Sequence, residues 1–313
     1  MLFLLALIPV IGLLVFIYFN DKKEKEPIGF LIALFFLGMA TVVTAIIGEW
    51  IGGAMLGVVF DETSVMKQII DAIFVVGFWE ELGKFMVLWL FTWKNKHFNY
   101  SYDAIVYAVF VSLGFAALEN VVYVFESGTG TAIARMLTAV PGHACFAVFM
   151  GFFYSKAKYA SLTKKKGTCI KNLLLAFVIP MFVHGVYDAI LMVGQVTSEN
   201  VGALAVLLWL GLVIAMFVVC IILVIRTSRH DFCIITTPEK EQTVYKPSVV
   251  GNWTCTCGSI NRMNFCPKCG NHRPVVTAWY CPKCGSPSSL NFCGNCGCPK
   301  PVYQTPAQPV IPQ

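Results

Sequence analysis

Long apolar runs follow one another through the first 226 residues of this chain, and they constrain its fold more than any other feature. A helix takes roughly 20 residues to cross a hydrocarbon core of about 30 Å, and seven of these runs are long enough. Because 57% of the 313 residues are hydrophobic and only 13% are charged, an ordinary soluble globular fold is excluded. The sequence predicts an all-α polytopic membrane protein with about seven transmembrane helices, at 1–19, 28–50, 69–93, 102–125, 132–155, 170–195 and 200–226.

Lysine and arginine residues between the runs indicate how the helices are oriented. Eleven lysines fall in alternate connecting segments, whereas only Lys67 and Arg135 fall on the other side. Basic segments favour the cytoplasmic side, so we expect the N-terminus outside the cell membrane and the chain after residue 226 in the cytoplasm. No basic residue precedes the first run, which we therefore expect to be a retained helix and not a cleaved signal peptide.

Cysteines are the main feature of the segment after the last run. Nine of the thirteen lie between Cys255 and Cys298, and the pattern of the first module recurs 27 residues later. In a reducing compartment, paired cysteines two or three residues apart indicate metal ligands and not disulfides. We expect structural zinc in two C-terminal zinc ribbons, held by Cys255, Cys257, Cys266 and Cys269 and by Cys281, Cys284, Cys293 and Cys296.

The pairing and the partner of these ribbons stay open at this point. One compact site formed by Cys266, Cys269, Cys281 and Cys284 is the alternative pairing. The segment 227–313 has eight basic and three acidic residues, a formal charge of +5. Eight thiolates and two zinc ions would lower this charge to about +1, so we do not expect nucleic acid as the partner. We expect the ribbons to bind a cytoplasmic protein in a docking or regulatory role.

Charged and polar side chains inside the expected spans are a second constraint. On insertion scales each charge near the bilayer centre costs about 2.5–3.5 kcal/mol, so these groups should face one another around a partly hydrated cavity. Lys84 follows Glu80 by four residues and Glu81 by three, so its amine can reach either carboxylate on one helix face. The set comprises Glu80, Glu81, Lys84, Glu119, His143, His184 and Asp188, whereas Glu49, Asp71 and Asp103 are expected near helix ends.

Four short motifs carry these groups: Glu80-Glu81-Leu82-Gly83-Lys84, then Gly114 to Asn120, then His143, then His184-Gly185-Val186-Tyr187-Asp188. In this order, on four successive expected helices, they resemble the PrsW family of intramembrane proteases, distant relatives of the CAAX-prenyl endopeptidases. The resemblance covers roughly residues 70–195 and leaves out the cysteine-rich tail. It implies an enzyme of the lipid bilayer that hydrolyses peptide bonds in membrane-protein substrates.

Roles for the acids and imidazoles follow from that resemblance. Glu80 and Glu81 resemble the family's water-activating pair, and His143 and His184 resemble its transition-state stabilisers. Two adjacent carboxylates in a medium of low dielectric cannot ionise equally easily, so one of them can act as a base near neutral pH. Imidazole donors would then stabilise the oxyanion. Which glutamate is the base stays open.

The remaining polar residues are expected to support that chemistry. Lys84 would keep the base charged, and Asp188 would orient His184, although the prenyl endopeptidases usually have Asn at the position of Asp188. Glu119, His143 and His184 could instead bind a catalytic zinc that keeps one position open. Because the chain has no His-Glu-x-x-His motif, we favour a metal-free glutamate mechanism and keep the catalytic metal as the alternative.

The expected domains are a transmembrane protease domain at 1–226, a linker at 227–250, two zinc ribbons at 251–300 and a disordered tail at 301–313. The alternative function is a non-enzymatic membrane scaffold or receptor whose ribbons recruit cytoplasmic partners. A proton-coupled transporter ranks below both, because no inverted repeat is visible. Substitution of Glu80 and Glu81 by Gln separates these functions: a protease loses turnover and keeps its fold, whereas a scaffold loses assembly.

Overall fold

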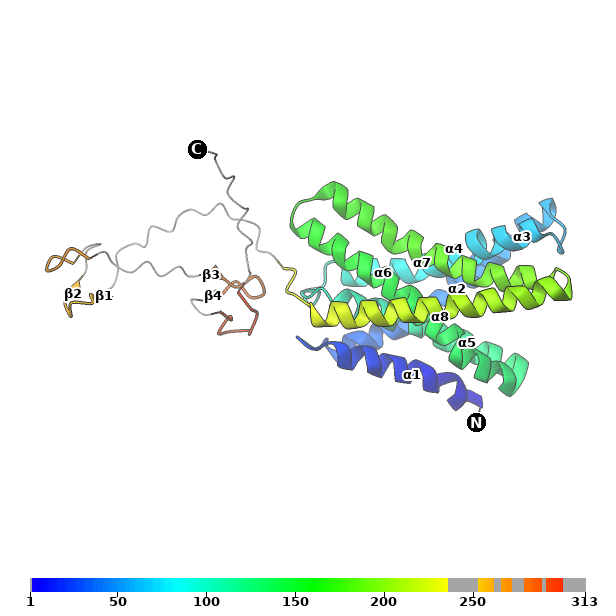
Figure 1. Ribbon diagram of the computed structural model, residues 1–313, viewed down its shortest axis with the longest axis horizontal. Helices are drawn as coiled ribbons and strands as arrows, with labels where there is room; N and C mark the ends of the chain where they lie inside the picture. Colours follow the sequence, from blue (N-terminus) through cyan, green and yellow to red (C-terminus); the bar gives the residue numbers. More distant parts are fainter. Residues whose placement is uncertain (1, 236–252, 262–265, 272–278, 289–290, 301–313) are drawn as a thin grey trace. The chain divides into compact units, whose positions relative to one another are not determined.

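The computed structural model describes residues 2–235, 253–261, 266–271, 279–288 and 291–300. Contacts divide the chain into two compact units, Met1–Ile234 and Ile235–Gln313. In the first unit the long helices lie side by side along one direction (Figure 1). Its elements are α1 (Leu2–Asn20), α2 (Ile28–Val59), α3 (Val65–Ile70), the π-helix η1 (Asp71–Val76), α4 (Gly77–Thr92), α5 (Asp103–Leu137), α6 (Ala139–Leu162), α7 (Lys166–Gln195) and α8 (Glu199–Arg229).

The expected fold class, an all-α polytopic membrane protein with C-terminal cysteine modules, is confirmed, but the count of seven spans is not. The expected spans at 102–125 and 132–155 fall in one helical stretch that bends at Gly128, where φ is 81° and ψ is −162°. Within the described residues, four helical stretches could cross a membrane by length and composition: Ile28–Val59, Asp103–Leu162, Lys166–Gln195 and Glu199–Arg229.

Two other expected spans are shorter helices than the sequence suggests. The run at 69–93 is divided among α3, η1 and α4, of which α4 is the longest with 16 residues. The first run forms α1, whose stretch Ala6–Asn20 is a shorter apolar helix. A hydropathy pattern does not show where a helix changes its hydrogen-bond spacing, so the interruption at η1 was not expected.

Helix α5 forms the centre of the bundle. Every residue from Asp103 to Ala117 is buried, and α1, α2, α4 and α6 all pack against this helix. The crossing with α2 is close, because a Cβ added to Gly38 would lie 2.0 Å from the carbonyl oxygen of Val111. Small residues allow this kind of backbone approach between membrane helices, where packing replaces the hydrophobic effect.

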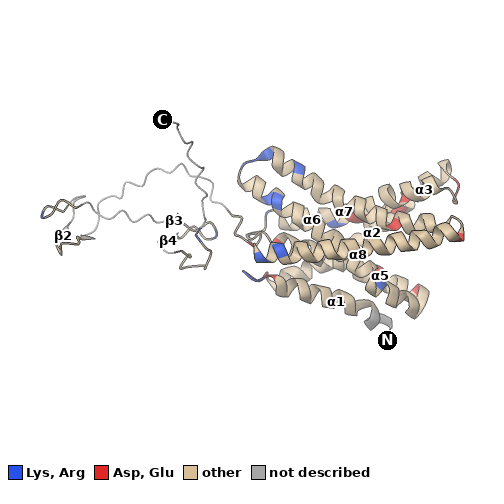
Figure 2. Ribbon diagram, in the orientation of Figure 1, with Lys and Arg blue, Asp and Glu red and all other residues tan. Residues whose placement is uncertain are grey.

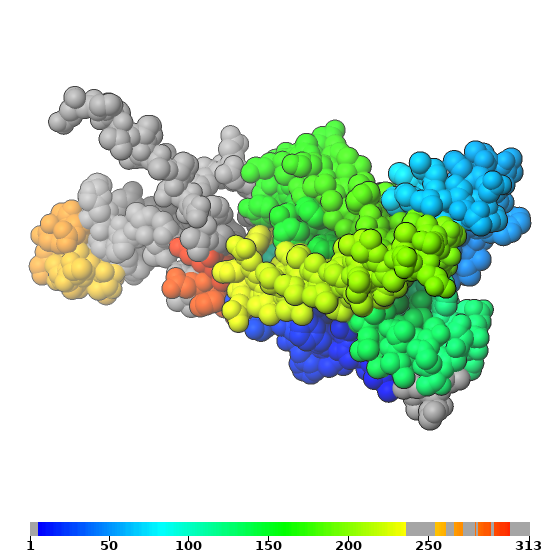
Figure 3. Space-filling model, turned by 45° about the vertical axis from the view of Figure 1, so that its right-hand side comes forward, coloured from blue at the N-terminus to red at the C-terminus, as the bar shows by residue number. Residues whose placement is uncertain are grey.

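Apolar side chains cover the outside of the bundle. Trp50 on α2 is 75% exposed and Leu207 on α8 is 66% exposed. Figure 3 shows α8 running along the surface of this unit. Exposed apolar surface of this extent is typical of helices in contact with lipid.

Lysine and arginine residues gather at one end of the bundle, around the turn between α6 and α7 and the end of α8 (Figure 2). We call this the basic end. The chain leaves the unit here, and Ile234 N donates to the carbonyl oxygen of Asn99 while Ser101 N donates to that of Phe232. The helical unit therefore continues beyond residue 226, the expected boundary, as far as Ile234.

The described residues of the second unit include two short antiparallel strand pairs. β1 (Trp253–Thr254) pairs with β2 (Ile260–Asn261), and β3 (Trp279–Tyr280) pairs with β4 (Pro287–Ser288). The expected linker at 227–250 and tail at 301–313 lie mostly or wholly outside the described residues. Four glycines that follow cysteines have positive φ, between 71° and 84°, as the expected metal-binding turns require: Gly258, Gly270, Gly285 and Gly297.

Candidate active site

Glu80, Glu81 and Lys84 lie on one face of α4, and all three side chains are buried. The Nζ of Lys84 is 3.0 Å from Oε2 of Glu80 and 2.8 Å from Oε1 of Glu81. The same ammonium lies 3.9 Å from the centre of the Phe115 ring on α5. Residues three and four apart meet on a helix surface, so α4 alone forms this trio. One cation thus balances two acids, and the fully ionised trio has one net negative charge.

Close packing of α7 against η1 and α4 places His184 beside this trio. A Cβ added to Gly77 would lie 2.8 Å from the carbonyl oxygen of Met181, and one added to Gly185 would lie 2.5 Å from Cα of Ile73. Only glycine permits such a backbone approach at both positions. Ile73 belongs to η1, and π-helical turns are frequent at functional sites.

His184 faces three carboxylates. Its Nδ1 lies 3.0 Å from Oε1 of Glu81, and its Nε2 lies 3.2 Å from Oδ2 of Asp188 and 3.9 Å from Oε2 of Glu80. Each ring nitrogen, when protonated, can therefore donate a hydrogen bond to a carboxylate oxygen. Phe146 stacks on the imidazole with ring centres 4.5 Å apart and fixes its plane.

His143 connects Lys84 to Glu119. Its Nδ1 lies 3.2 Å from Nζ of Lys84, and because an ammonium only donates, this nitrogen accepts. The Nε2 then has the proton and donates to Oε2 of Glu119 at 2.9 Å. Arg135 holds the same oxygen at 2.9 Å. The rings of His143 and His184 have centres 5.3 Å apart, so the two networks touch.

The seven residues that the sequence singles out therefore meet in one connected cluster, built by α4, α5, α6 and α7. One polar atom in it, Oε2 of Glu81, is buried without a hydrogen-bond partner among the described residues. A buried acceptor of this kind is normally satisfied by a water molecule, so the cluster suits a bound water.

Two charged residues near the cluster were not expected there. From the sequence, Arg135 indicates only how the helices are oriented in the membrane. In the structure its guanidinium pairs with Glu119. Arg135 falls within the expected span 132–155, so the cost of a charge in lipid would have identified it. Glu49, expected near a helix end, lies on α2 within electrostatic range of Glu119 and His184.

A metal-compatible set exists in the cluster, but it differs from the trio expected from the sequence. Ligand atoms that all lie within 4.8 Å of one another come from Glu80, Glu81, His143 and His184, and Glu119 is outside this set. Imidazole and carboxylate donors suit zinc. However, the ammonium of Lys84 lies within 3.2 Å of acceptors on three of the four residues. In this arrangement the acceptors of these three residues already have a cation, the ammonium of Lys84.

The cysteines of the second unit form two separate groups of four. Within each group the sulfur atoms all lie within 4.8 Å of one another, and the closest pairs are 3.3–3.6 Å apart. Four ligands around a tetrahedral zinc with Zn–S bonds of about 2.3 Å lie about 3.8 Å apart, so each group could hold one ion. The groups follow the repeat and not the compact alternative: Cys255, Cys257, Cys266 and Cys269, and Cys281, Cys284, Cys293 and Cys296.

Comparison with known proteins agrees with this site. The family described as "PrsW family intramembrane metalloprotease" matches residues 26–242. Protease PrsW of Geobacillus kaustophilus is 35% identical over 201 residues, which cover 64% of this chain and 84% of the relative. The corresponding protease of Clostridioides difficile is 36% identical over 197 residues, covering 61% and 79%.

Protease PrsW of Bacillus subtilis is 34% identical over 189 residues, which cover 58% of this chain and 79% of the relative. No solved structure matches the chain. The family match extends over well more than half of the 313 residues and includes every helix that contributes to the cluster. The chain belongs to the PrsW family of intramembrane proteases.

Proposed function

We propose that this protein hydrolyses peptide bonds of membrane-protein substrates with a water molecule activated by glutamate. Membership of a protease family supports the reaction class. The observation that carries the mechanism is the position of Glu80 and Glu81, which lie next to one ammonium and 3.9 and 3.0 Å from the two nitrogens of His184.

Glu80 is the better candidate for the base. Oε1 of Glu81 is shared between Lys84 and His184 at 2.8 and 3.0 Å, and the Glu81 side chain is completely buried. Glu80 has its ion pair with Lys84 at 3.0 Å and retains 6% exposure. A base must reach its water molecule within hydrogen-bond distance, which favours the less constrained and more accessible carboxylate.

The reaction then needs only groups of this chain. Glu80 takes a proton from water, and the oxygen of that water bonds to the scissile carbonyl carbon while the carbonyl oxygen becomes an oxyanion. Glu80 returns the proton to the amide nitrogen, the oxyanion re-forms the C=O bond as the C–N bond breaks, and a carboxylic acid and an amine leave. His184 donates to the oxyanion from Nε2, whose hydrogen is shared with Asp188 at 3.2 Å and which lies 3.9 Å from Glu80.

His143 fits a positioning role better than the expected oxyanion role. Its Nδ1 accepts from the Lys84 ammonium at 3.2 Å and has no proton to donate, and its Nε2 faces Glu119 at 2.9 Å, whereas both nitrogens of His184 face carboxylates and can both be protonated. In this arrangement His143 holds Lys84 in place and connects it to the ion pair between Glu119 and Arg135. Asp188 contacts Nε2 of His184 at 3.2 Å and would orient this ring.

Substitution of Glu80 by Gln tests the mechanism. Full-length protein in proteoliposomes is incubated with a panel of single-pass membrane proteins, and fragments are identified by mass spectrometry. We expect the variant to lose at least about a hundredfold in rate, because general base catalysis contributes that much or more. Glu126→Gln, an exposed glutamate of α5, is the matched control and should cleave normally. Normal cleavage by Glu80→Gln would exclude Glu80 as the base.

The number of metal ions bound per chain tests whether the reaction proceeds without a metal ion in the membrane cluster. The two cysteine groups should give two zinc ions per full-length chain, and no further divalent ion should depend on the membrane cluster. A third ion that is present in the wild type and lost in His143→Ala and His184→Ala would show a metal centre in the membrane and overturn the glutamate mechanism.

For the second unit we propose two structural zinc ribbons on the cytoplasmic side that bind a cytoplasmic protein. The sulfur geometry supports the zinc ions, and the gathering of lysines at the basic end supports the orientation. Protease protection of intact cells tests the orientation: an epitope at the C-terminus should be cut only after the membrane is opened. Cutting on intact cells would reverse the proposed topology.

A further inference from the structure

A large pocket lies between α6, α7 and α8 at the basic end, apart from the catalytic cluster. Its volume is about 810 Å³. On α6, Lys156 lines it one turn nearer the end of the bundle than Phe152, and on α8, Arg226 lines it three residues beyond Leu223. Both helices therefore present a cation toward the basic end and an apolar side chain deeper along the bundle.

Three cationic residues line the pocket. Lys165, from the turn between α6 and α7, joins Lys156 and Arg226 at the rim, and all three side chains are exposed. None of these three forms an ion pair within the described part of the chain, and no acidic residue is among those that line the pocket. Ser155 and Asn172, both buried, add a hydroxyl and an amide to the floor.

Exposed apolar surface adjoins the pocket on α8. Val219, one turn before Leu223 on the same face of this helix, is 44% exposed. A ligand that reaches the cations along α8 therefore passes apolar side chains. Basic pockets between membrane helices on the side of the lysine-rich loops are suited to anionic lipid head groups.

We propose that this pocket binds an anionic phospholipid. Its phosphate group lies among Lys156, Lys165 and Arg226, its polar head group reaches the hydroxyl of Ser155 or the amide of Asn172, and its acyl chain runs along the apolar deeper wall. The phosphate chemistry is shared with free inorganic phosphate, but the apolar wall with Phe152 and Leu223 fits an acyl chain and not a free phosphate.

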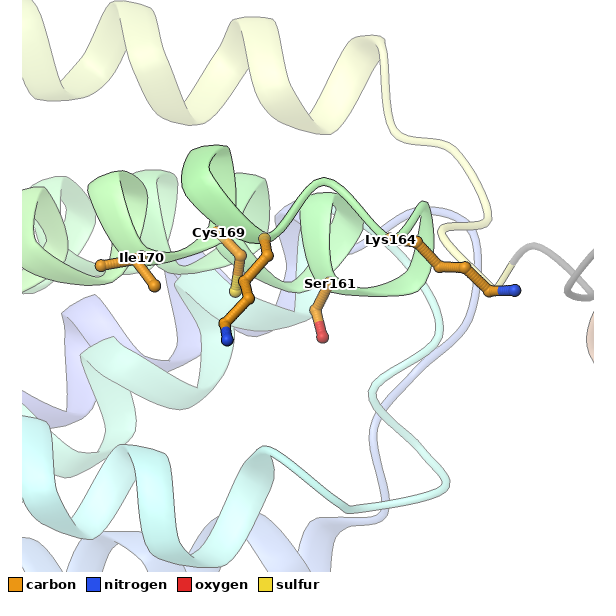
Figure 4. A pocket seen from close by; sticks show the side chains of 5 residues that line it. Ser161, Lys164, Cys169 and Ile170 are labelled. Atoms are coloured by element: carbon orange, nitrogen blue, oxygen red, sulfur yellow. The ribbon is translucent and has the colours of Figure 1, made fainter.

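A second, smaller pocket lies nearby and is also lined by lysines. It has a volume of about 240 Å³ and lies at the same turn between α6 and α7, lined by Ser161, Lys164, Lys166, Cys169 and Ile170. Figure 4 shows Lys164 extending away from Ser161 and Cys169. Its lysines thus belong to the same basic surface but do not line the larger pocket.

Native mass spectrometry of the full-length protein tests the proposal. The protein is released from nanodiscs of equal parts dioleoyl phosphatidylglycerol and dioleoyl phosphatidylcholine, and the retained lipids are counted. We expect the wild type to retain phosphatidylglycerol selectively. The variant Lys156→Gln/Lys165→Gln/Arg226→Gln should lower the ratio of anionic to zwitterionic lipid about tenfold or more. The control Lys164→Gln/Lys166→Gln/Lys171→Gln removes the same charge from the same region and should keep the wild-type ratio.

The proposal fails if both triple variants lose the anionic lipid equally, since a diffuse surface charge would then explain retention. It also fails if the wild type shows no preference between the two lipids. Displacement of the retained lipid by millimolar inorganic phosphate would identify a free phosphate site and overturn the lipid assignment. If the triple variant does not fold, the charge reversal Arg226→Glu, at an exposed position near the end of α8, should weaken the preference in the same direction.

Discussion

Lys84 is the side chain that connects the two halves of the proposed active site. Its ammonium lies within hydrogen-bond distance of Glu80, Glu81 and His143, and its side chain is 1% exposed. Buried charges are tolerated only when they are paired, so each member of this cluster depends on the others. Lys84 is therefore as important for the stability of the cluster as for its chemistry.

Substitution Lys84→Met should both destabilise the protein and abolish cleavage. It leaves two carboxylates buried without their cation, and removal of one partner of a buried ion pair costs about 3–5 kcal/mol. Thermal unfolding in detergent, followed by the circular dichroism of the helices, should show a lower Tm. The matched control Lys171→Met, an exposed lysine of α7, should leave the Tm and cleavage unchanged. A wild-type Tm for Lys84→Met would show that the ammonium is not required for stability.

At the scale of residues, the sequence predicted which side chains meet but not how they meet. The cost of a charge in lipid identifies Glu80, Glu81 and Lys84 whatever the fold, and helical spacing alone places them on one face. That Nδ1 of His143 faces Lys84 while Nε2 faces Glu119 depends on the rotation of a ring between three helices. Spacing along the chain contains no information on that rotation.

At the scale of elements, the contact between η1 and α7 positions the site. Gly185 lies directly after His184, and its Cα faces the backbone of Ile73 so closely that a Cβ would lie 2.5 Å from Cα of that residue. The distance between α7 and the glutamates of α4 is therefore set by the absence of a side chain at residue 185.

Substitution Gly185→Ala should reduce cleavage strongly while the protein stays folded. The added methyl group forces α7 away from η1, and a displacement of about 1 Å can cost roughly a hundredfold in rate. The rate with a fixed membrane substrate and the Tm are measured together. Gly211→Ala on α8, where an added Cβ has no neighbour within 4 Å, is the control and should cleave at the wild-type rate. Wild-type cleavage by Gly185→Ala would mean that this contact does not position His184.

Hydropathy predicted the helical class but not how its elements are divided. Runs of about 20 apolar residues indicate helices because their backbone groups must be satisfied inside lipid. The run 69–93 meets that criterion, yet the π-helical turn η1 divides it between α3 and α4. The bend at Gly128, inside α5, has a positive φ that only the structure could show.

At the scale of the whole molecule, the two units have different sources of stability. The helical unit has an extensive apolar core around α5, whereas the described strands of the second unit are two residues long. Small modules with so little regular structure obtain their folding free energy from bound metal. The two units should therefore respond differently to the same treatment.

Removal of zinc should unfold the second unit and leave the helical unit folded. A strong chelator takes the ions from the cysteine groups, and without them four thiolates in each group repel one another. Limited proteolysis should then cut after residue 235 at much lower protease concentration, whereas the helical circular dichroism should not change. Readdition of zinc should restore protection. Loss of the helical signal on chelation would contradict this independence.

The stability of the helical unit should depend on pH through Asp21, which follows α1 outside the expected spans. Asp21 is fully buried, and neither of its carboxylate oxygens has a hydrogen-bond partner among the described residues. Burial raises the pKa of Asp21 to about 7, an effect that Lys25 opposes and Asp231 increases. The folded protein thus keeps a proton that the unfolded chain releases near its ordinary pKa of 3.8.

The contribution of Asp21 to the free energy of unfolding should therefore be highest below about pH 4 and fall as the pH rises toward about 7, because the unfolded state gains charge that the folded state resists. Burial also raises the pKa of Glu26, so Glu26 should likewise lower the free energy of unfolding as the pH rises. Asp21→Asn should remove its part of the slope in Tm against pH, whereas the exposed Asp61→Asn should not. An unchanged slope in Asp21→Asn would mean that Asp21 is ionised in the folded protein, and its carboxylate would then need a cation or water that satisfies both oxygens.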